Sequence, residues 1–151
     1  MKEFVTWNVI DEAVTDIAFN IKNTNKDFKG VYGIPRGGLI LAVMLSHKLD
    51  LPLIMSKDEL DENSIIIDDI ADTGKTLLDF VEYESYVVTI HEHEQSLIKP
   101  DYSVIDKGDK WIVYPWETED SEEIQDYLKW VNLFIFHLSL QVQWVLHLQR
   151  M

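Results

Sequence analysis

The chain has 151 residues, of which 46% are hydrophobic and 26% charged, and this composition predicts one globular domain with a substantial core rather than a disordered segment. Its 13 basic and 27 acidic residues give a net charge of −14, which argues against nucleic acid or an anionic membrane as the partner, because phosphate groups are bound by Lys and Arg. Without cysteine there can be no disulfide, and residues 1–4 lack the apolar segment of a secretion signal, so we expect a cytoplasmic protein.

The first predicted elements are a helix and a short strand. Apolar residues recur at three- and four-residue steps over 7–22, which predicts an amphipathic helix with Thr6 as its N-cap. A polar turn at 23–29 separates this helix from a short buried strand predicted at 30–34.

A glycine-rich loop, Pro35-Arg36-Gly37-Gly38, follows this strand directly. A mostly apolar helix is predicted after it, over 39–49. A strand–loop–helix unit of this kind can bind an anion, and the Arg36 guanidinium can form two parallel hydrogen bonds to phosphate oxygens. The next region predicts a second strand at 51–55 and then a short acidic connection at 56–63.

The most informative stretch is 64–76, which combines an apolar strand, two acids and a small polar turn. Asp68 and Asp69 follow the strand, and a helix is predicted over 77–84. The Thr- and Gly-rich turn at 72–76 can direct several backbone N–H groups at one anion, with the helix dipole assisting. The two acids suit vicinal hydroxyl groups or Mg²⁺ rather than the phosphate itself. The stretch therefore predicts a site for a sugar phosphate.

This stretch has two alternative interpretations. Gly74-Lys75-Thr76 could end a Walker P-loop, but that motif needs a glycine five positions before Gly74, and residue 69 is Asp. The second alternative is an ordinary strand-to-helix turn that binds nothing.

Residues 64–76 resemble the phosphoribosyl-pyrophosphate motif of the type I phosphoribosyltransferases, in which Asp-Asp, two residues and Asp-Thr-Gly-x-Thr follow an apolar strand. The resemblance implies an α/β fold with a mostly parallel central sheet flanked by helices, and substrate at the carboxyl ends of the strands. It implies that Asp68 and Asp69 bind the ribose hydroxyls and Mg²⁺, and that Asp72 is the catalytic general acid/base facing purine N7. The residues implied to bind the 5′-phosphate are Thr73, Gly74, Lys75 and Thr76.

The loop at 35–38 looks like the pyrophosphate loop of the xanthine/guanine-type enzymes in this family. This resemblance implies that Arg36 and Gly37 contact pyrophosphate, and that a non-proline cis peptide occurs here, with the Pro35–Arg36 bond as the candidate. The sequence departs from the family at 56–63, where active members usually carry a long flexible loop that closes over the substrate. We expect this lid to be shortened.

A strand is predicted at 86–91, and a histidine- and glutamate-rich segment, 91–94, ends it. The two histidines, His91 and His93, suggest a metal site, but no third ligand is evident and the HExxH motif is absent. We therefore expect a solvated strand end at this position.

A predicted strand at 101–104 is preceded by a Lys-Pro pair and followed, after a polar turn, by an aromatic segment at 111–117. These segments resemble the base-binding end of xanthine/guanine and hypoxanthine phosphoribosyltransferases. There a Lys-Pro presents its ammonium to the purine 6-oxo group, and a Trp-Ile supplies an aromatic face and a backbone contact. The resemblance implies that Lys99, Trp111 and Ile112 bind the purine, although Trp111 could instead belong to the core.

The end of the chain is predicted to differ from the rest. We expect Trp116 to pack against the core, and the capping-box spacing after Asp120 predicts a short helix. Apolar residues then alternate with partly polar ones, which predicts a long amphipathic strand too polar for a membrane span. We expect a phosphoribosyltransferase-like domain at 1–120, and a tail at 121–151 that packs on the domain or on a second subunit of a homo-oligomer.

The resemblance implies a purine phosphoribosyltransferase, a glycosyltransferase of purine salvage that uses phosphoribosyl pyrophosphate, Mg²⁺ and guanine, xanthine or hypoxanthine. The alternative is a non-catalytic protein of the same fold that binds nucleotides or regulates another process, which the short connection at 56–63 favours. A third possibility is an unrelated doubly wound binding domain.

Overall fold

The computed structural model describes residues 1–120, and Met1–Thr118 forms one compact unit. The predicted helix after Asp120 and the predicted strand-like tail lie outside the described residues. No helix within residues 1–120 is both long and apolar enough to span a membrane.

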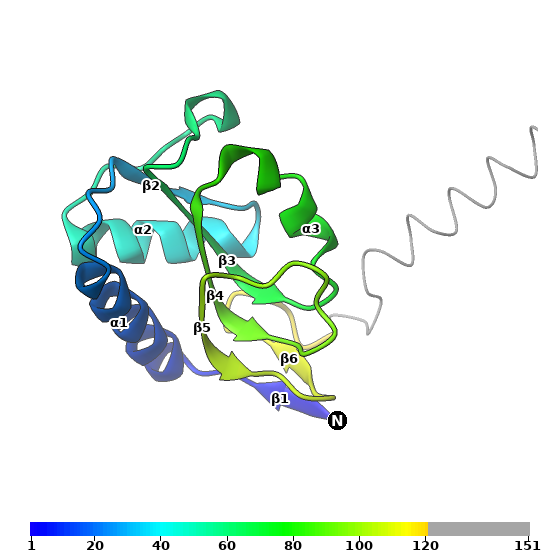
Figure 1. The fold of residues 1–151 in the computed structure, drawn as a ribbon. Coiled ribbons are helices and arrows are strands. Elements are labelled where there is room, and N and C mark those ends of the chain that lie inside the picture. Colours follow the sequence, from blue (N-terminus) through cyan, green and yellow to red (C-terminus); the bar gives the residue numbers. More distant parts are fainter. Residues whose placement is uncertain (121–151) are drawn as a thin grey trace, which may run out of the picture. The chain divides into compact units, whose positions relative to one another are not determined.

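The centre of Met1–Thr118 is a four-stranded parallel sheet with the strand order β2–β3–β4–β5 (Figure 1). The strands are β2 (Gly30–Gly33), β3 (Ser64–Ala71), β4 (Tyr86–Glu92) and β5 (Tyr102–Asp106). All pairings in this sheet are parallel, as the predicted fold class requires. The segments that follow these strands therefore meet at one edge of the sheet, where open α/β sheets bind their ligands.

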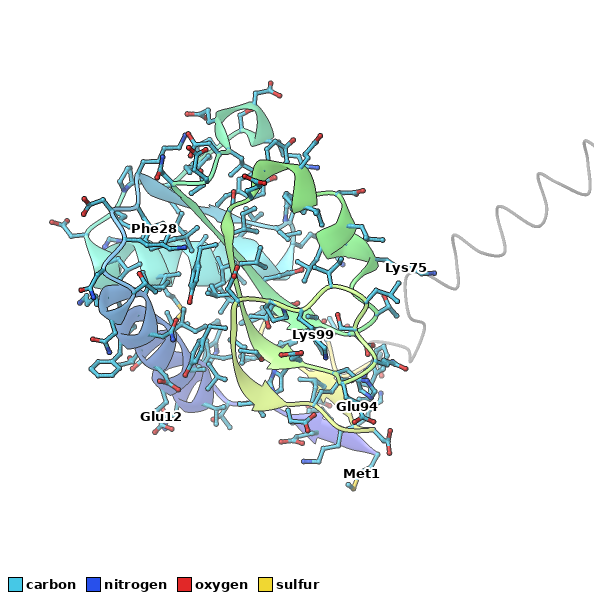
Figure 2. All side chains as sticks on the ribbon, in the orientation of Figure 1. Met1, Glu12, Phe28, Lys75, Glu94 and Lys99 are labelled. Carbon is cyan, nitrogen blue, oxygen red and sulfur yellow. The ribbon has the colours of Figure 1, made fainter. Side chains whose placement is uncertain are left out.

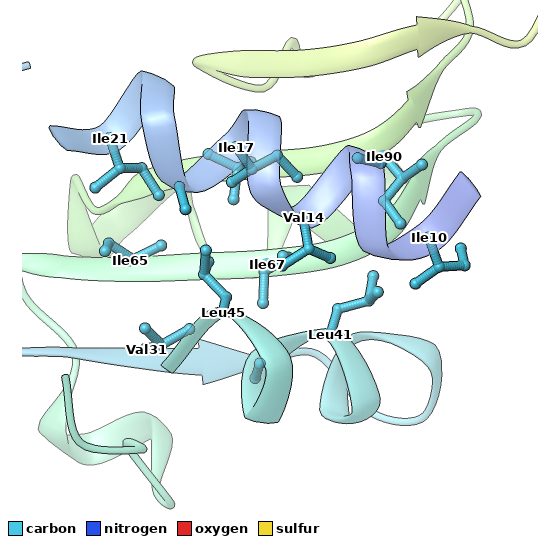
Figure 3. Close-up of a cluster of buried hydrophobic side chains, with 14 of the residues drawn as sticks. Ile10, Val14, Ile17, Ile21, Val31, Leu41, Leu45, Ile65, Ile67 and Ile90 are labelled. Carbon is cyan, nitrogen blue, oxygen red and sulfur yellow. The ribbon is translucent and has the colours of Figure 1, made fainter. Parts of the chain in front are cut away.

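Two helices, α1 (Trp7–Asn23) and α2 (Gly37–Leu49), cover one face of the sheet (Figure 1). The N-cap prediction for α1 is confirmed, because the Thr6 hydroxyl oxygen accepts a hydrogen bond from the Val9 backbone N–H at 3.4 Å. Figure 3 shows the core between these helices and the sheet. Its fully buried members include Ile10, Val14, Ile17, Leu41, Leu45, Val31, Ile65, Ile67 and Ile90.

A smaller apolar cluster covers the other face, where the predicted helix over 77–84 is wrong in length. The chain forms the four-residue helix α3 (Lys75–Leu78) and then a 3₁₀ turn, η2 (Val81–Tyr83). Phe80 is buried against the ring of Tyr32, with the ring centroids 5.8 Å apart. Aromatic and β-branched residues have low helix propensity, which is consistent with the early end of α3.

The predicted strand at 51–55 is also wrong, since only one bridge, between Val31 and Leu53, joins it to the sheet. The Val31 N–H donates to the Pro52 carbonyl at 3.0 Å, and the Ile54 N–H donates to the Val31 carbonyl at 2.8 Å. Pro52 has no N–H of its own, so the ladder cannot extend further through it. The acidic connection that follows contains one 3₁₀ turn, η1 (Lys57–Glu59), and is as short as predicted.

A second, two-stranded parallel sheet joins the start of Met1–Thr118 to its end. It pairs β1 (Lys2–Phe4) with β6 (Trp111–Val113). The predicted aromatic segment at 111–117 thus contains a strand, but its partner is β1, which the sequence did not predict. Three residues are too few for a readable alternation of apolar and polar positions.

Candidate functional site

The loop after β2 lies directly against the acids at the end of β3. The bond between Pro35 and Arg36 is cis, as the resemblance implied. A Cβ atom built on Gly37 would lie 1.9 Å from Asp69 Oδ2, so a larger residue would force this carboxylate to rotate away. Two segments more than thirty residues apart, the predicted pyrophosphate loop and the predicted ribose acids, are therefore in contact.

The acids Asp68 and Asp69 are held where water has little access. Asp68 is 8% exposed, and its Oδ1 accepts a hydrogen bond from the Asp69 backbone N–H at 3.0 Å. Burial, and then the charge of Asp69, raise the pKa of Asp68 well above its usual range. Burial raises the pKa of Asp69 to about 6, and the nearby Glu117 carboxylate adds to that rise. The free protein thus carries an electrostatic cost that a bound cation would relieve.

The predicted phosphate turn has one packed side and one side with unused donors. Gly74 has a φ of 78°, and a Cβ atom there would lie 2.6 Å from the Ile98 backbone nitrogen. The Leu97 N–H donates to the Thr73 carbonyl at 2.9 Å, which ties the turn to the loop after β4. Among residues 1–120, the backbone N–H groups of Gly74 and Thr76 have no acceptor. A glycine turn with free N–H groups can bind an anion, but a four-residue α3 adds little dipole to it.

Asp72, the predicted general acid/base, forms an ion pair with Lys107. The Lys107 Nζ lies 3.0 Å from Asp72 Oδ1, and the lysine side chain is only 8% exposed. The Gln95 side-chain amide donates to the same oxygen at 3.2 Å. Lys107 follows β5 directly, and its backbone N–H donates to the Glu92 carbonyl at the end of β4. Sequence reasoning missed Lys107, because it lies in what looks like an ordinary polar turn.

Lys99, the predicted ligand of the purine oxo group, is engaged elsewhere. Its Nζ lies 2.7 Å from Glu92 Oε1, and it also donates to the backbone carbonyls of His93 and Glu94. Figure 2 shows Lys99 and Glu94 on the side of the sheet where β3, β4 and β5 end. Lys99 is thus near the predicted site, but its ammonium contacts the end of β4 and the loop after it, and not Asp72.

The two residues predicted to contact the purine ring, Trp111 and Ile112, both lie in β6. Trp111 is half-buried, and its indole N–H is buried without an acceptor among residues 1–120. Ile112 is buried and belongs to the main core cluster. Trp116 packs against the same cluster and stacks on Tyr114, with parallel rings 4.9 Å apart, as expected for a core residue.

The expectation of a solvated strand end at 91–94 is wrong, because both histidines are buried. His91 is 1% exposed and His93 is 8% exposed. His91 lies within the sheet, where its Nδ1 is 2.8 Å from the Tyr114 hydroxyl oxygen. Tyr114 was not singled out from the sequence, since nothing near it along the chain marks a polar partner.

The carboxyl groups of Asp68 and Asp69 are of the chemical type that binds Mg²⁺. Mg²⁺ bound with phosphate substrates is typically held by one or two carboxylates, substrate oxygens and water. No group of three or more His, Cys, Asp or Glu side chains within the described part of the chain is arranged to hold a metal. Two adjacent carboxyls with raised pKa values, Asp68 buried and Asp69 half-buried, fit an ion that binds together with its substrate.

Comparisons with known proteins identify relatives of the chain, although no family model matches it. A purine phosphoribosyltransferase from Pyrococcus horikoshii is 32% identical, and its crystal structure superposes with a TM-score of 0.68 over 82% of this chain and 99% of that one. Xanthine-guanine phosphoribosyltransferases from Desulfotalea psychrophila and Idiomarina loihiensis are 27% and 24% identical, each over 76% of this chain and 86% of the relative.

A further structure supports the fold alone. The xanthine-guanine-hypoxanthine phosphoribosyltransferase of Helicobacter pylori is 17% identical and has a TM-score of 0.68, over 79% of this chain and 95% of that one. The identity to the Pyrococcus horikoshii protein is above 30%, and this chain covers nearly all of that protein. The chain therefore belongs to the type I phosphoribosyltransferases, the glycosyltransferase family that includes the xanthine-guanine and other purine phosphoribosyltransferases.

Proposed function

We propose that this protein transfers a phosphoribosyl group from phosphoribosyl pyrophosphate to N9 of an oxo-purine and releases pyrophosphate. The observation that supports this most is the contact between Gly37 and the Asp69 carboxylate. Phosphoribosyl pyrophosphate carries its pyrophosphate on C1 of the ribose, next to the 2′- and 3′-hydroxyl groups. A site for this molecule therefore needs a pyrophosphate loop beside acids that accept hydrogen bonds from hydroxyl groups.

The ribose and its phosphates would be bound by residues at the ends of β2 and β3. Asp68 and Asp69 would accept hydrogen bonds from the ribose hydroxyls and hold Mg²⁺, which would neutralise charge on the pyrophosphate leaving group. Arg36 and Gly37 would contact the pyrophosphate. The 5′-phosphate would be bound by the turn of Thr73, Gly74, Lys75 and Thr76, where the N–H groups of Gly74 and Thr76 support this role.

The purine would present its N7 edge to Asp72, which would act as the general acid/base. In an oxo-purine, O6 lies beside N7 on the same edge of the ring. A base whose N7 meets Asp72 would therefore bring its oxo group toward the ammonium of Lys107, 3.0 Å from that carboxylate. We propose Lys107 for the oxo group in preference to Lys99, whose ammonium is bonded to Glu92 and two carbonyls.

The remaining base contacts are the predicted ones, Trp111 and Ile112. The half-buried Trp111 would supply part of an aromatic face, and β6 backbone groups near Ile112 would contact the ring edge. The transition state of glycosyl transfer resembles an oxocarbenium ion, so most of the catalysis would come from positioning and charge stabilisation.

The test is release of pyrophosphate from phosphoribosyl pyrophosphate with guanine, xanthine or hypoxanthine, and with adenine as the 6-amino control. Turnover with an oxo-purine that depends on Mg²⁺ is the expected result. Magnesium-dependent binding without turnover would instead identify a binding protein of the same fold.

The lysine assignment has a matched pair of variants, Lys107→Gln and Lys99→Gln. We expect Lys107→Gln to raise KM for hypoxanthine about ten- to hundredfold, since a buried charged hydrogen bond to the base is lost. Lys99→Gln should change this KM less than about threefold. The reverse order would return the role to Lys99. A cytoplasmic location and self-association through the tail stay predictions.

A further inference from the structure

A buried chain of hydrogen bonds connects β4, the segment after β6 and the peptide group of Asp69. The Tyr114 hydroxyl donates to the Asp69 backbone carbonyl at 2.9 Å. His91 Nδ1 lies 2.8 Å from the same hydroxyl oxygen. His91 and Tyr114 are 1% and 3% exposed, so water cannot readily replace either partner.

The directions of these two hydrogen bonds follow from the single proton on the Tyr114 hydroxyl. A tyrosine hydroxyl has one proton, and Tyr114 gives it to the Asp69 carbonyl. The second bond must then run from the His91 Nδ1–H to the Tyr114 oxygen, which makes His91 the Nδ1–H tautomer. Burial lowers the pKa of His91 to about 4, and burial together with the Asp69 and Asp68 charges raises that of Tyr114, so both groups are neutral at pH 7.

The Asp69 carbonyl needs such a donor because it lies beyond the end of β2. The last pair between β2 and β3 joins Gly33 to Ile67, and the Ile34 N–H then donates to the Ile67 carbonyl at 3.0 Å. Two residues later the chain of β2 has turned away into the loop at 35–38. A buried carbonyl without a donor is costly, and the Tyr114 hydroxyl supplies the donor here.

Tyr114 is itself held firmly on three sides. Its ring stacks on Trp116 with centroids 4.9 Å apart, and it meets the His91 ring edge-on at 5.6 Å. Its backbone N–H donates to Glu117 Oε2 at 2.9 Å. It also follows directly on Val113, the last residue of β6. A donor fixed in this way fixes the peptide that accepts from it.

We propose that Tyr114, held by His91, is a positioning residue that fixes the Asp69–Ile70 peptide relative to β6, and thereby aligns the ribose acids with the base-binding strand. The proposal rests on the proposed function, because it assigns β6 to the base and the two acids to the ribose. Neither Tyr114 nor His91 touches the reacting atoms in this scheme. Their effect on the reaction passes through the backbone of Asp69.

The test compares Tyr114→Phe with Tyr86→Phe. Each change removes one hydroxyl, but the Tyr86 hydroxyl donates to Asn20 at 3.0 Å, at the opposite end of β4. We expect Tyr114→Phe to lower kcat/KM for phosphoribosyl pyrophosphate about ten- to hundredfold, as a small displacement of positioned groups does. KM for the purine should change less than about threefold, and Tyr86→Phe should resemble the wild type.

Variants of the histidine add a graded readout. His91→Gln retains a side-chain N–H donor for the Tyr114 oxygen, whereas His91→Leu retains none. We expect the loss with His91→Gln to be smaller than that with His91→Leu. Equal losses, at equal thermal stability, would mean that His91 acts by packing alone and would overturn its part of the proposal.

A second measurement does not depend on turnover. The amide of Ile70 belongs to the same peptide group as the Asp69 carbonyl, so its NMR shift and hydrogen-exchange rate report on the Tyr114 bond. We expect both to change in Tyr114→Phe and not in Tyr86→Phe.

An unchanged Ile70 amide, or normal kinetics in an active but less stable Tyr114→Phe protein, would overturn the proposal. Inactivity of the wild type with all bases would count against the proposed function, and the amide measurement would still decide whether Tyr114 fixes the peptide.

Discussion

Replacing Asp69 with Asn should stabilise the free protein at neutral pH while it removes activity. The half-buried carboxyl of Asp69 lies against Gly37, and its pKa rises from the ordinary value of 3.8 to about 6. A rise of this size corresponds to an ionisation cost of about 3 kcal/mol, and of about 1–3 kcal/mol if some water reaches the group. Asn has nearly the same shape and carries no charge, so it avoids this cost. The expected rise in Tm at pH 7.5 is roughly 3–10 °C.

The stability difference between Asp69→Asn and the wild type should depend on pH. A carboxyl whose pKa is raised in the folded state stabilises the fold while it is protonated, and this stability is lost as the pH rises from about 4 through about 6. The difference between Asp69→Asn and the wild type should therefore be large at pH 7.5 and small at pH 4. Thermal unfolding without substrate or Mg²⁺, followed by circular dichroism, measures it. A difference that is the same at both pH values, or a less stable variant at pH 7.5, would refute the argument.

A matched control is Asp61→Asn. Asp61 is an exposed acid that pairs with Lys29 at 2.6 Å, and this contact lowers its pKa. Loss of this carboxylate removes a favourable surface interaction, so the variant should be equal to the wild type or slightly less stable at pH 7.5. The opposite signs of the two Asp→Asn changes separate the effect of burial from a general effect of reducing the net charge of −14.

Three further predictions concern the loop, the general acid/base and the tail. Gly37→Ala places a Cβ atom 1.9 Å from Asp69 Oδ2, so the carboxylate must rotate away, and calorimetry should show that phosphoribosyl pyrophosphate binding with Mg²⁺ falls at least about tenfold while the fold persists. Asp72→Asn should reduce kcat about 10²- to 10⁴-fold but leave substrate binding nearly unchanged, and an equal loss of both would contradict its catalytic role. Removal of residues 131–151 should change the oligomeric state or solubility in light scattering, and a soluble monomer in both forms would count against the predicted packing of the tail.

The parts of the site that lie close together in the sequence could be predicted. Asp68 and Asp69 lie close to the turn at 72–76 along the chain, and the apolar run before them is easy to recognise, although β3 extends through both acids instead of ending before them as predicted. The contact between the loop at 35–38 and Asp69 follows from the parallel topology, because loops after neighbouring parallel strands meet at one edge. What these residues bind stays a prediction.

Contacts that depend on the packing of distant segments could not be predicted. The Lys-Pro pair resembles a family motif and therefore indicates Lys99 as the ligand of the purine oxo group. Lys107 carries no such motif, and it lies beside Asp72 because β5, which it follows, pairs with β4. The same holds for Tyr114, whose hydroxyl donates to the carbonyl of a residue 45 positions away along the chain. Nothing in the sequence near Lys107 or Tyr114 indicates that its side chain has a buried polar partner, so only the three-dimensional structure identifies these two residues.

Electrostatics explains how so acidic a chain could bind a substrate with several phosphates. Lys107 is buried but already paired with Asp72, and Arg36 and Lys75 are exposed at the starts of α2 and α3, so their charges are screened by water and supply only part of the attraction for the phosphates. The glycine turn offers uncharged N–H donors, which bind an anion without adding a buried cation. Burial, with nearby carboxylates adding to it, disfavours the ionised forms of Asp68 and Asp69, and a cation entering with the substrate would offset this cost of ionisation. Affinity for the substrate should therefore depend steeply on Mg²⁺, and more steeply in the wild type than in Asp69→Asn.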